Sequence, residues 1–245
     1  MRVDILTLFP EMFTSPFSSS IIRRARERGL VTIEVHDLRD WATGPHRQAD
    51  DYGFGGGAGM VMKADVIIPA LQAVRGDDGH VVYLSPQGEV LTQPLVARLA
   101  RRPHLVLLCG HYQGIDERCS RFIDQEISLG DFVLTGGEIP AMAVTDAVVR
   151  LIPGVLGSEA SHAGESFSRG LLEHPLYTRP RVVAGMEVPP VLLSGDHQAI
   201  RRWRLRLSLL RTLLKRPDLL LQRSYDAEER QVLEELLFGP PGGGR

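Results

Sequence analysis

Three glycine-containing segments of the chain have the residue types needed to bind a ligand through the main chain. They are SPQG (85–88), CGHYQGID (109–116) and LGDFVLTGGEIPA (129–141). Glycine allows a ligand or another chain segment to approach the backbone closely. Main-chain amides and carbonyls can then recognise an adenine edge or a ribose without charged side chains. One such segment alone is typical of an ordinary turn, whereas three at successive strand ends favour a shared pocket.

Alternating strands and helices are predicted around these turns. Strands are predicted at 3–9, 31–35, 81–85 and 105–110, with further short strands in RFIDQEI (121–127) and FVLTG (132–136). Helices are predicted at 18–29, 64–74, 91–100 and 138–151, and a long glycine-rich loop at 37–60. The alternation indicates the α/β fold class, with a mostly parallel sheet covered on both faces. The carboxyl ends of parallel strands lie at one edge of a sheet, so the three turns are expected to meet there.

The composition changes after Ile152. Residues 153–170 are small and polar, which is typical of a linker. An amphipathic basic helix is predicted at 197–216 and an acidic helix at 226–238. The sequence therefore predicts a ligand-binding domain at 1–157, a flexible linker at 158–170 and a small all-helical domain at 171–245.

Composition narrows the class of protein. The chain has 245 residues, 43% of them hydrophobic, and a formal net charge of −2, so no global field indicates nucleic acid or membrane binding. Its two cysteines, Cys109 and Cys119, form no CxxC motif, which argues against zinc and against a disulfide framework. No apolar run approaches the length of a membrane span. We expect a soluble cytoplasmic protein.

Two common nucleotide-binding motifs are missing. The first predicted strand is followed by FPEMF (9–13), where a dinucleotide-binding fold would have GxGxxG. GGGAG (55–59) lacks the Lys-Ser/Thr of a phosphate-binding loop. A dinucleotide-dependent enzyme and a nucleoside triphosphatase are therefore both disfavoured.

The longer motifs closely resemble those of the bacterial tRNA (guanine-N1-)-methyltransferases. These motifs are YLSPQG, CGHYQGID, GDFVLTGGEIPA, IPGVLG, YTRP, GMEVPPVLLSG and HQAIRRWR, with LFPEMF and DDYGFGGGAGM near the start. They occur in order over nearly the whole chain. The resemblance implies the SPOUT class, whose strands and loops form a deep trefoil knot, a topology that pattern reasoning would not propose. It also implies a homodimer, in which the partner's linker and C-terminal domain complete the pocket.

The reaction implied by the resemblance uses S-adenosylmethionine and yields S-adenosylhomocysteine. The methyl group goes to N1 of the guanosine 3′-adjacent to the anticodon, position 37 of tRNA. The implied cofactor-binding residues are Tyr83, Leu84, Ser85, Pro86, Gly110, Tyr112, Gly114, Leu129, Gly130, Asp131, Phe132, Val133, Leu134, Gly136, Gly137 and Pro140. Gln113 stands where the family usually has glutamate, so magnesium binding is left open and no metal ligand is assigned.

Methylation at guanine N1 requires a base for the N1 proton and a cation or donor for the charge that develops at O6. The resemblance assigns charge stabilisation to Arg150, although a helix-face pair with Asp146 is an alternative. It assigns the base to Glu165, where the family has aspartate, and the alternative is a solvated linker charge like Glu159. Tyr112 is placed either to stack on the target base or to pack as an ordinary aromatic.

The RRWR cluster in the basic helix favours RNA binding by Arg201, Arg202 and Arg204. The alternative is a helix whose charges pair with the acidic helix. Arg39, His46 and Arg47 in the long early loop are further candidate RNA contacts. Two other functions remain open at this point: a knotted RNA methyltransferase with a different target nucleotide, and a non-catalytic RNA-binding homologue.

Overall fold

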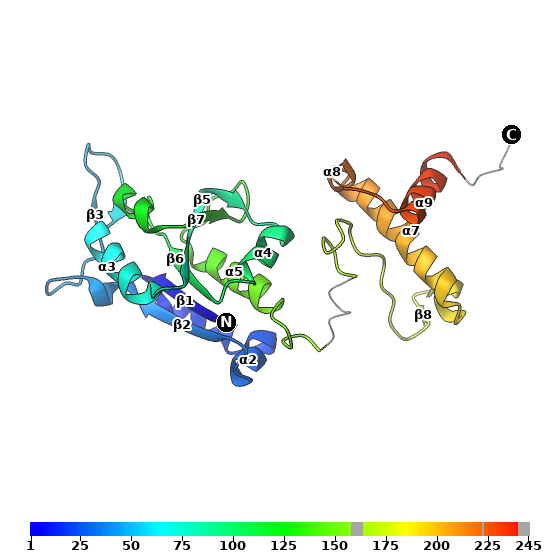
Figure 1. The fold of residues 1–245 in the computed structure, drawn as a ribbon, viewed down its shortest axis with the longest axis horizontal. Coiled ribbons are helices and arrows are strands. Elements are labelled where there is room, and N and C mark those ends of the chain that lie inside the picture. The colour runs from blue at the N-terminus through cyan, green and yellow to red at the C-terminus, as the bar shows by residue number, and fades with distance from the viewer. Residues whose placement is uncertain (158–163, 222, 240–245) are drawn as a thin grey trace. The chain divides into compact units, whose positions relative to one another are not determined.

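The chain folds into two compact units, Met1–Gly157 and Ser158–Arg245 (Figure 1). The structure, a computed structural model, describes residues 1–157, 164–221 and 223–239. Part of the predicted linker, 158–163, lies outside the described residues. None of the described helices is both long enough and apolar enough to cross a bilayer.

A five-stranded sheet forms the centre of the first unit. Its strand order is β2-β1-β6-β5-β7, and every neighbouring pair is parallel. The strands are β1 (Arg2–Thr7), β2 (Thr32–Asp37), β5 (Gly79–Val90), β6 (His104–Cys109) and β7 (Gln125–Ser128). The predicted α/β fold with a mostly parallel sheet is confirmed.

Helices cover both faces of this sheet. Alternate side chains of β6 enter different cores: Leu105 and Leu107 join one, and Val106 and Leu108 the other. The first core includes residues of α2 (Ser20–Glu27), α4 (Gln93–Leu99) and α5 (Glu138–Val149), and the second includes residues of α3 (Ala64–Arg75). Shorter helical turns are η1 (Pro10–Phe13), α1 (Thr14–Phe17), η2 (Leu38–Trp41) and η3 (Glu117–Phe122). Burial on both faces explains the nearly continuous apolar runs of the strands.

Three local predictions differ from the structure. The SPQG segment does not end its strand, because β5 continues to Val90 after a register shift between Leu84 and Glu89. FVLTG (132–136) forms no strand: only Gly136 makes an isolated bridge, to His111, and Val133 is 83% exposed. The long loop contains an antiparallel hairpin of β3 (Asp50–Tyr52) and β4 (Met60–Met62).

The second unit is built around two packed helices, α7 (His197–Lys215) and α9 (Ala227–Phe238), which lie side by side in Figure 1. Leu209 and Val232 are fully buried between them. Both helices begin with an aspartate cap, Asp196 for α7 and Asp226 for α9, as expected for such residues at helix starts. The unit also contains η4 (Pro190–Leu193), α8 (Asp218–Leu221) and a short antiparallel pair of strands, β8 (Val182–Val183) and β9 (Met186–Glu187), so it is not all-helical as predicted.

Candidate active site

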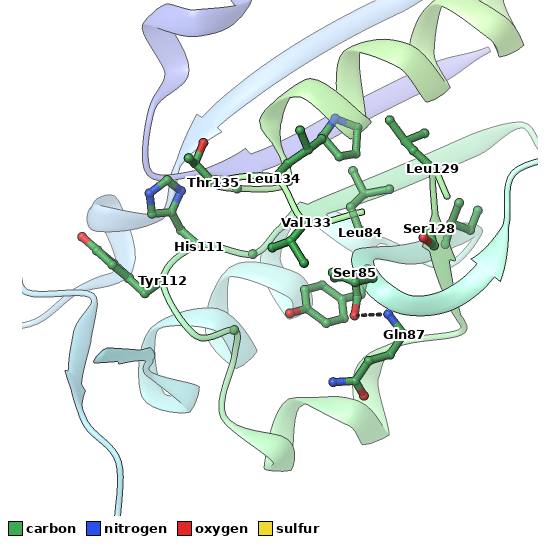
Figure 2. Close-up of a pocket in the computed structure, with 18 of the residues that line it drawn as sticks. Leu84, Ser85, Gln87, His111, Tyr112, Ser128, Leu129, Val133, Leu134 and Thr135 are labelled. Atoms are coloured by element: carbon green, nitrogen blue, oxygen red, sulfur yellow. Dashed lines mark hydrogen bonds between the residues drawn. The ribbon is translucent and has the colours of Figure 1, made fainter. Parts of the chain in front are cut away.

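A pocket of about 230 Å³ lies where the SPQG segment inside β5 meets the turns that follow β6 and β7 (Figure 2). Its lining comprises Tyr83, Leu84, Ser85, Pro86, Gln87, Gly110, His111, Tyr112, Gln113, Gly114, Ile127, Ser128, Leu129, Phe132, Val133, Leu134, Thr135, Gly136, Gly137 and Pro140. The carboxyl edge of a parallel sheet is the usual place for a ligand in this kind of fold. The three glycine-containing segments therefore meet at one site.

Nearly all of the predicted cofactor-binding residues line this pocket. The exceptions are Gly130 and Asp131, which lie in the same turn but outside the lining. Lining residues without a predicted role are Gln87, His111, Gln113, Ile127, Ser128 and Thr135. Four of them lie within the motifs that carried the prediction, and Ile127 and Ser128 directly precede the segment 129–141, so their neighbours in sequence were the available signal.

Glycine at position 137 allows two turns to cross. The Gly137 N–H donates to the Gly110 carbonyl at 2.7 Å, and a Cβ at 137 would lie 2.7 Å from the Cα of Cys109. Gly88 is equally confined, since a Cβ there would lie 2.3 Å from the backbone nitrogen of Ile127. These neighbours are backbone atoms, which can shift only at a large cost in free energy. A side chain at either position would therefore push the two neighbouring chain segments apart.

Tyr83 forms one wall of the pocket. Its ring occupies the space beside Gly110, where a Cβ would lie 2.8 Å from Tyr83 carbon and oxygen atoms. Burial raises the pKa of the Tyr83 phenol to about 12, and the nearby Glu126 carboxylate adds to the effect. The phenol is therefore neutral at physiological pH and available as a hydrogen-bonding group.

Tyr112 stands at the mouth of the pocket in an uncommon backbone conformation. Its φ is +58°, in the left-handed region that a tyrosine rarely adopts, and the side chain is 47% exposed. Its ring meets His111 edge-on, with centroids 4.9 Å apart (Figure 2). An exposed aromatic beside a ligand pocket suits stacking on a base, although the edge contact with His111 is itself a packing role.

Gln113 connects the pocket to the β3–β4 hairpin. Its side-chain amide donates to the Ala58 carbonyl, and its backbone N–H donates to the Met60 carbonyl at 3.1 Å. The uncharged side-chain amide of Gln113 thus binds the loop between β3 and β4. The described residues contain no group of three or more histidine, cysteine, aspartate or glutamate side chains arranged to hold a metal ion.

Both cysteines are buried thiols. Burial raises the pKa of Cys109 well above its ordinary value and that of Cys119 to about 12. A thiol that resists ionisation is a poor nucleophile.

The two predicted catalytic residues are not among the residues that line this pocket within its unit. Arg150 follows the last residue of α5, whereas Pro140, near the start of the helix, lines the pocket. Ten residues of α-helix separate them by roughly 15 Å along the axis. Glu165 belongs to the second unit, where it lines another cavity of about 390 Å³ together with Arg169, His174, Arg201 and Arg204, among others.

The predicted RNA-binding arginines of α7 have different surroundings. Arg201 pairs with Glu228 at 3.0 Å, and Arg202 pairs with Glu235 at 2.6 Å. Within the described part of the chain, Arg204 has no ion-pair partner. Helix pairing therefore occupies the first two guanidinium groups and leaves that of Arg204 for another ligand.

In the early loop, Arg39 donates to the Leu8 carbonyl and lies 5.7 Å over the Phe9 ring. Arg47 pairs with Asp40, and His46 is exposed. The two arginines therefore already have partners within the unit.

The parallel sheet, with a pocket lined by main-chain turns at its carboxyl edge, is typical of a ligand-binding α/β protein. The family model described as "tRNA (Guanine-1)-methyltransferase TrmD" matches residues 1–222. The chain belongs to this family.

Curated relatives cover the chain almost completely. A tRNA (guanine-N(1)-)-methyltransferase of Syntrophomonas wolfei is 60% identical over 97% of this chain and 98% of its own length. Proteins of the same name from Dictyoglomus turgidum and Pelotomaculum thermopropionicum are 52% and 55% identical, each over 96% of its own length. Family membership implies the SPOUT fold and, in general terms, the use of S-adenosylmethionine.

Proposed function

We propose that this chain transfers the methyl group of S-adenosylmethionine to N1 of the guanosine at position 37 of tRNA, 3′-adjacent to the anticodon. The names of its relatives support the reaction. The observation that carries the proposal is the meeting of three motif turns in one pocket at the sheet edge. The family context favours a cytoplasmic enzyme.

The pocket suits an adenosine. Leu84, Leu129 and Leu134 give it apolar walls for a purine ring, and the glycine turns expose amides and carbonyls for the base edge and ribose. When bound, the donor supplies a sulfonium, which is already an activated leaving group. The remaining task of the protein is to hold donor and acceptor in line.

Glu165 and Arg150 are the proposed catalytic residues. The Glu165 carboxylate takes the N1 proton of guanine, which turns N1 into a nucleophile. The Arg150 guanidinium stabilises the negative charge that develops at O6. Product release leaves the carboxylate protonated, and exchange with water restores it.

A homodimer is proposed because Arg150 and the pocket lie at opposite ends of α5. Arg150 lies roughly 15 Å along α5 from the pocket residue Pro140, a distance set by the helix rise. The linker and helices of a second copy, placed over the pocket of the first, would bring Glu165 and the arginines of α7 to it. Closed two-fold dimers are the commonest oligomers of soluble proteins.

A deep trefoil knot is proposed for the first unit. It is supported by the tight passage of Gly137 beside Gly110 and by the bridge between His111 and Gly136. The return of β5 to pair with β7 at Glu89 and Val90 adds a further close crossing.

An assay with labelled S-adenosylmethionine tests the proposed reaction. The acceptors are two transcripts of one tRNA that differ only in guanosine or adenosine at position 37. We expect label in the guanosine transcript alone, and nuclease digestion should release it as 1-methylguanosine. Equal labelling of both transcripts, or label at another nucleotide, would refute the proposal.

A further inference from the structure

A buried carboxylate lies directly behind the pocket. Glu138 is the first residue of α5 and only 2% exposed. One of its oxygens, Oε1, accepts the hydroxyl proton of Thr7 at 2.8 Å, and Thr7 is the last residue of β1. A buried carboxylate with one hydrogen bond has unused acceptor capacity, and leaving it unused is costly.

The imidazole of His111 faces the other oxygen of this carboxylate. Its Nδ1 lies 3.6 Å from Glu138 Oε2 and is buried, with no hydrogen-bond partner in the described part of the chain. Phe9 and Tyr112 hold the ring, with centroids 4.8 and 4.9 Å from it. The gap exceeds a typical N–H···O hydrogen bond by roughly 0.7 Å.

Gly136 makes the approach of these two groups possible. A Cβ at this position would lie 2.3 Å from Glu138 Oε2 and 2.4 Å from His111 Nδ1. The bridge between the backbones of His111 and Gly136 keeps the two turns in register. The side chains are therefore aimed at each other across a glycine that has no room for any other residue.

We propose that His111 is a positioning residue of the methyl-donor pocket. Its Nδ1–H donates to the Glu138 carboxylate and so ties the turn at 110–114 to the turn at 135–137. Both turns line the pocket, and Thr7 anchors the pair to the end of β1. When the donor binds, a shift of the turns by roughly 0.7 Å brings Nδ1 and Oε2 to hydrogen-bond distance. The inference rests on the proposed function, because it assumes that this pocket holds the donor.

A packing role alone would depend on ring shape and would not distinguish the two ring nitrogens. Substitution by asparagine or glutamine separates these cases. In His111→Asn the amide nitrogen takes a place close to Nδ1, whereas in His111→Gln it takes a place close to Nε2. The two variants are matched controls for each other.

The test measures S-adenosylhomocysteine affinity by calorimetry, together with the melting temperature of each protein. We expect His111→Asn to bind within about threefold of the wild type and His111→Gln to bind about tenfold more weakly, the effect of one charge-assisted hydrogen bond. Glu138→Gln should also weaken binding about tenfold. Equal affinities for the two His111 variants would overturn the inference.

A spectroscopic readout covers the case in which a variant fails to fold. In wild-type protein with ¹⁵N-labelled histidine and bound S-adenosylhomocysteine, the His111 signal should show a protonated Nδ1. Its assignment comes from the spectrum of His111→Asn or, if that variant is unfolded, from through-bond correlations in the wild type. An unprotonated Nδ1 would overturn the inference. Failure of the wild type to bind S-adenosylhomocysteine would refute the proposed function itself.

Discussion

Glu165 is the residue on which the proposed proton transfer depends. It lines a cavity of the second unit beside Arg169 and His174, a position that differs from a freely solvated linker charge. A carboxylate can be replaced by an amide of the same shape without removing hydrogen-bonding capacity, so the substitution isolates its basicity.

We predict that Glu165→Gln keeps its affinity for S-adenosylhomocysteine and loses about 10²- to 10⁴-fold in single-turnover methyl transfer, the range for a missing general base. Glu187→Gln, on the β8–β9 hairpin of the same unit, is the matched control and should react at the wild-type rate. Near-normal transfer by Glu165→Gln would remove this residue from the base role.

Asp4 is a second residue whose charge matters, here for stability. It is fully buried in β1. Burial raises the pKa of its carboxyl, but hydrogen bonds from His36, Arg2 and His104 outweigh this effect and hold the pKa well below its ordinary value. A lowered native pKa means that the stabilisation is present above the unfolded pKa of about 3.9 and is lost as the pH falls below it.

Asp4→Asn should therefore destabilise the first unit by about 3 kcal/mol at pH 7, because it leaves three donors around a neutral amide. The difference from the wild type should shrink between about pH 4 and pH 3. Urea unfolding at pH 7, 5 and 3.5 measures it, with Asp65→Asn, a surface partner of Lys63, as control. An unchanged difference at pH 3.5 would contradict the assignment.

Some residues of the site could be predicted from the sequence, and others could not. The glycines, Tyr83 and the leucines were predictable because they lie in recognisable sequence motifs. The contact of His111 with Glu138 was not, since 27 positions separate the two residues and only the fold brings them within 3.6 Å. The pairing of Arg202 with Glu235 depends in the same way on how α7 meets α9.

At the scale of elements, periodicity located the regular helices and strands well. The predicted helix at 64–74 corresponds to α3 (Ala64–Arg75), and that at 197–216 corresponds to α7 (His197–Lys215). Short apolar runs were less informative. Phe132 to Leu134 have the composition of a strand, yet they line a pocket, and composition alone cannot distinguish an apolar wall from a sheet position.

The surroundings of the α7 arginines lead to different expected effects. Arg204→Ala should weaken tRNA binding and lower the slope of log affinity against log salt by about 0.7 to 0.9, the contribution of one phosphate contact. Arg202→Ala should instead lower stability by about 1 kcal/mol or less, as for a partly exposed ion pair. Filter binding over a range of salt concentrations, with thermal unfolding, measures both. Equal salt slopes for Arg204→Ala and the wild type would contradict an RNA contact.

At the scale of the whole molecule, the sequence indicated a change of character after Ile152, and the first compact unit ends at Gly157. Composition can reveal such a boundary because a linker lacks apolar periodicity. Chain threading leaves no comparable trace, since a strand in a knot has the same residue pattern as one in an ordinary sheet. The prediction of a knot therefore rested on family resemblance alone.

A shared site predicts that two inactive variants restore each other. Arg150→Ala and Glu165→Gln are each expected to be inactive as homodimers. After mixing and subunit exchange, half of the dimers contain one Arg150→Ala subunit and one Glu165→Gln subunit. If Arg150 and Glu165 of a site come from different subunits, each of these mixed dimers has one intact site. Activity should then return to about one quarter of the wild-type value. No recovery, with subunit exchange verified by mass, would show that both residues act within one copy.

The position of the methyl donor is the most direct test of the proposed enzyme. A crystal structure with S-adenosylhomocysteine should show the adenosine enclosed by the segments 83–86, 110–114 and 129–137, in contact with their main-chain amides and carbonyls. Adenosine density at a site that none of these segments touches would contradict the proposal that this pocket holds the donor.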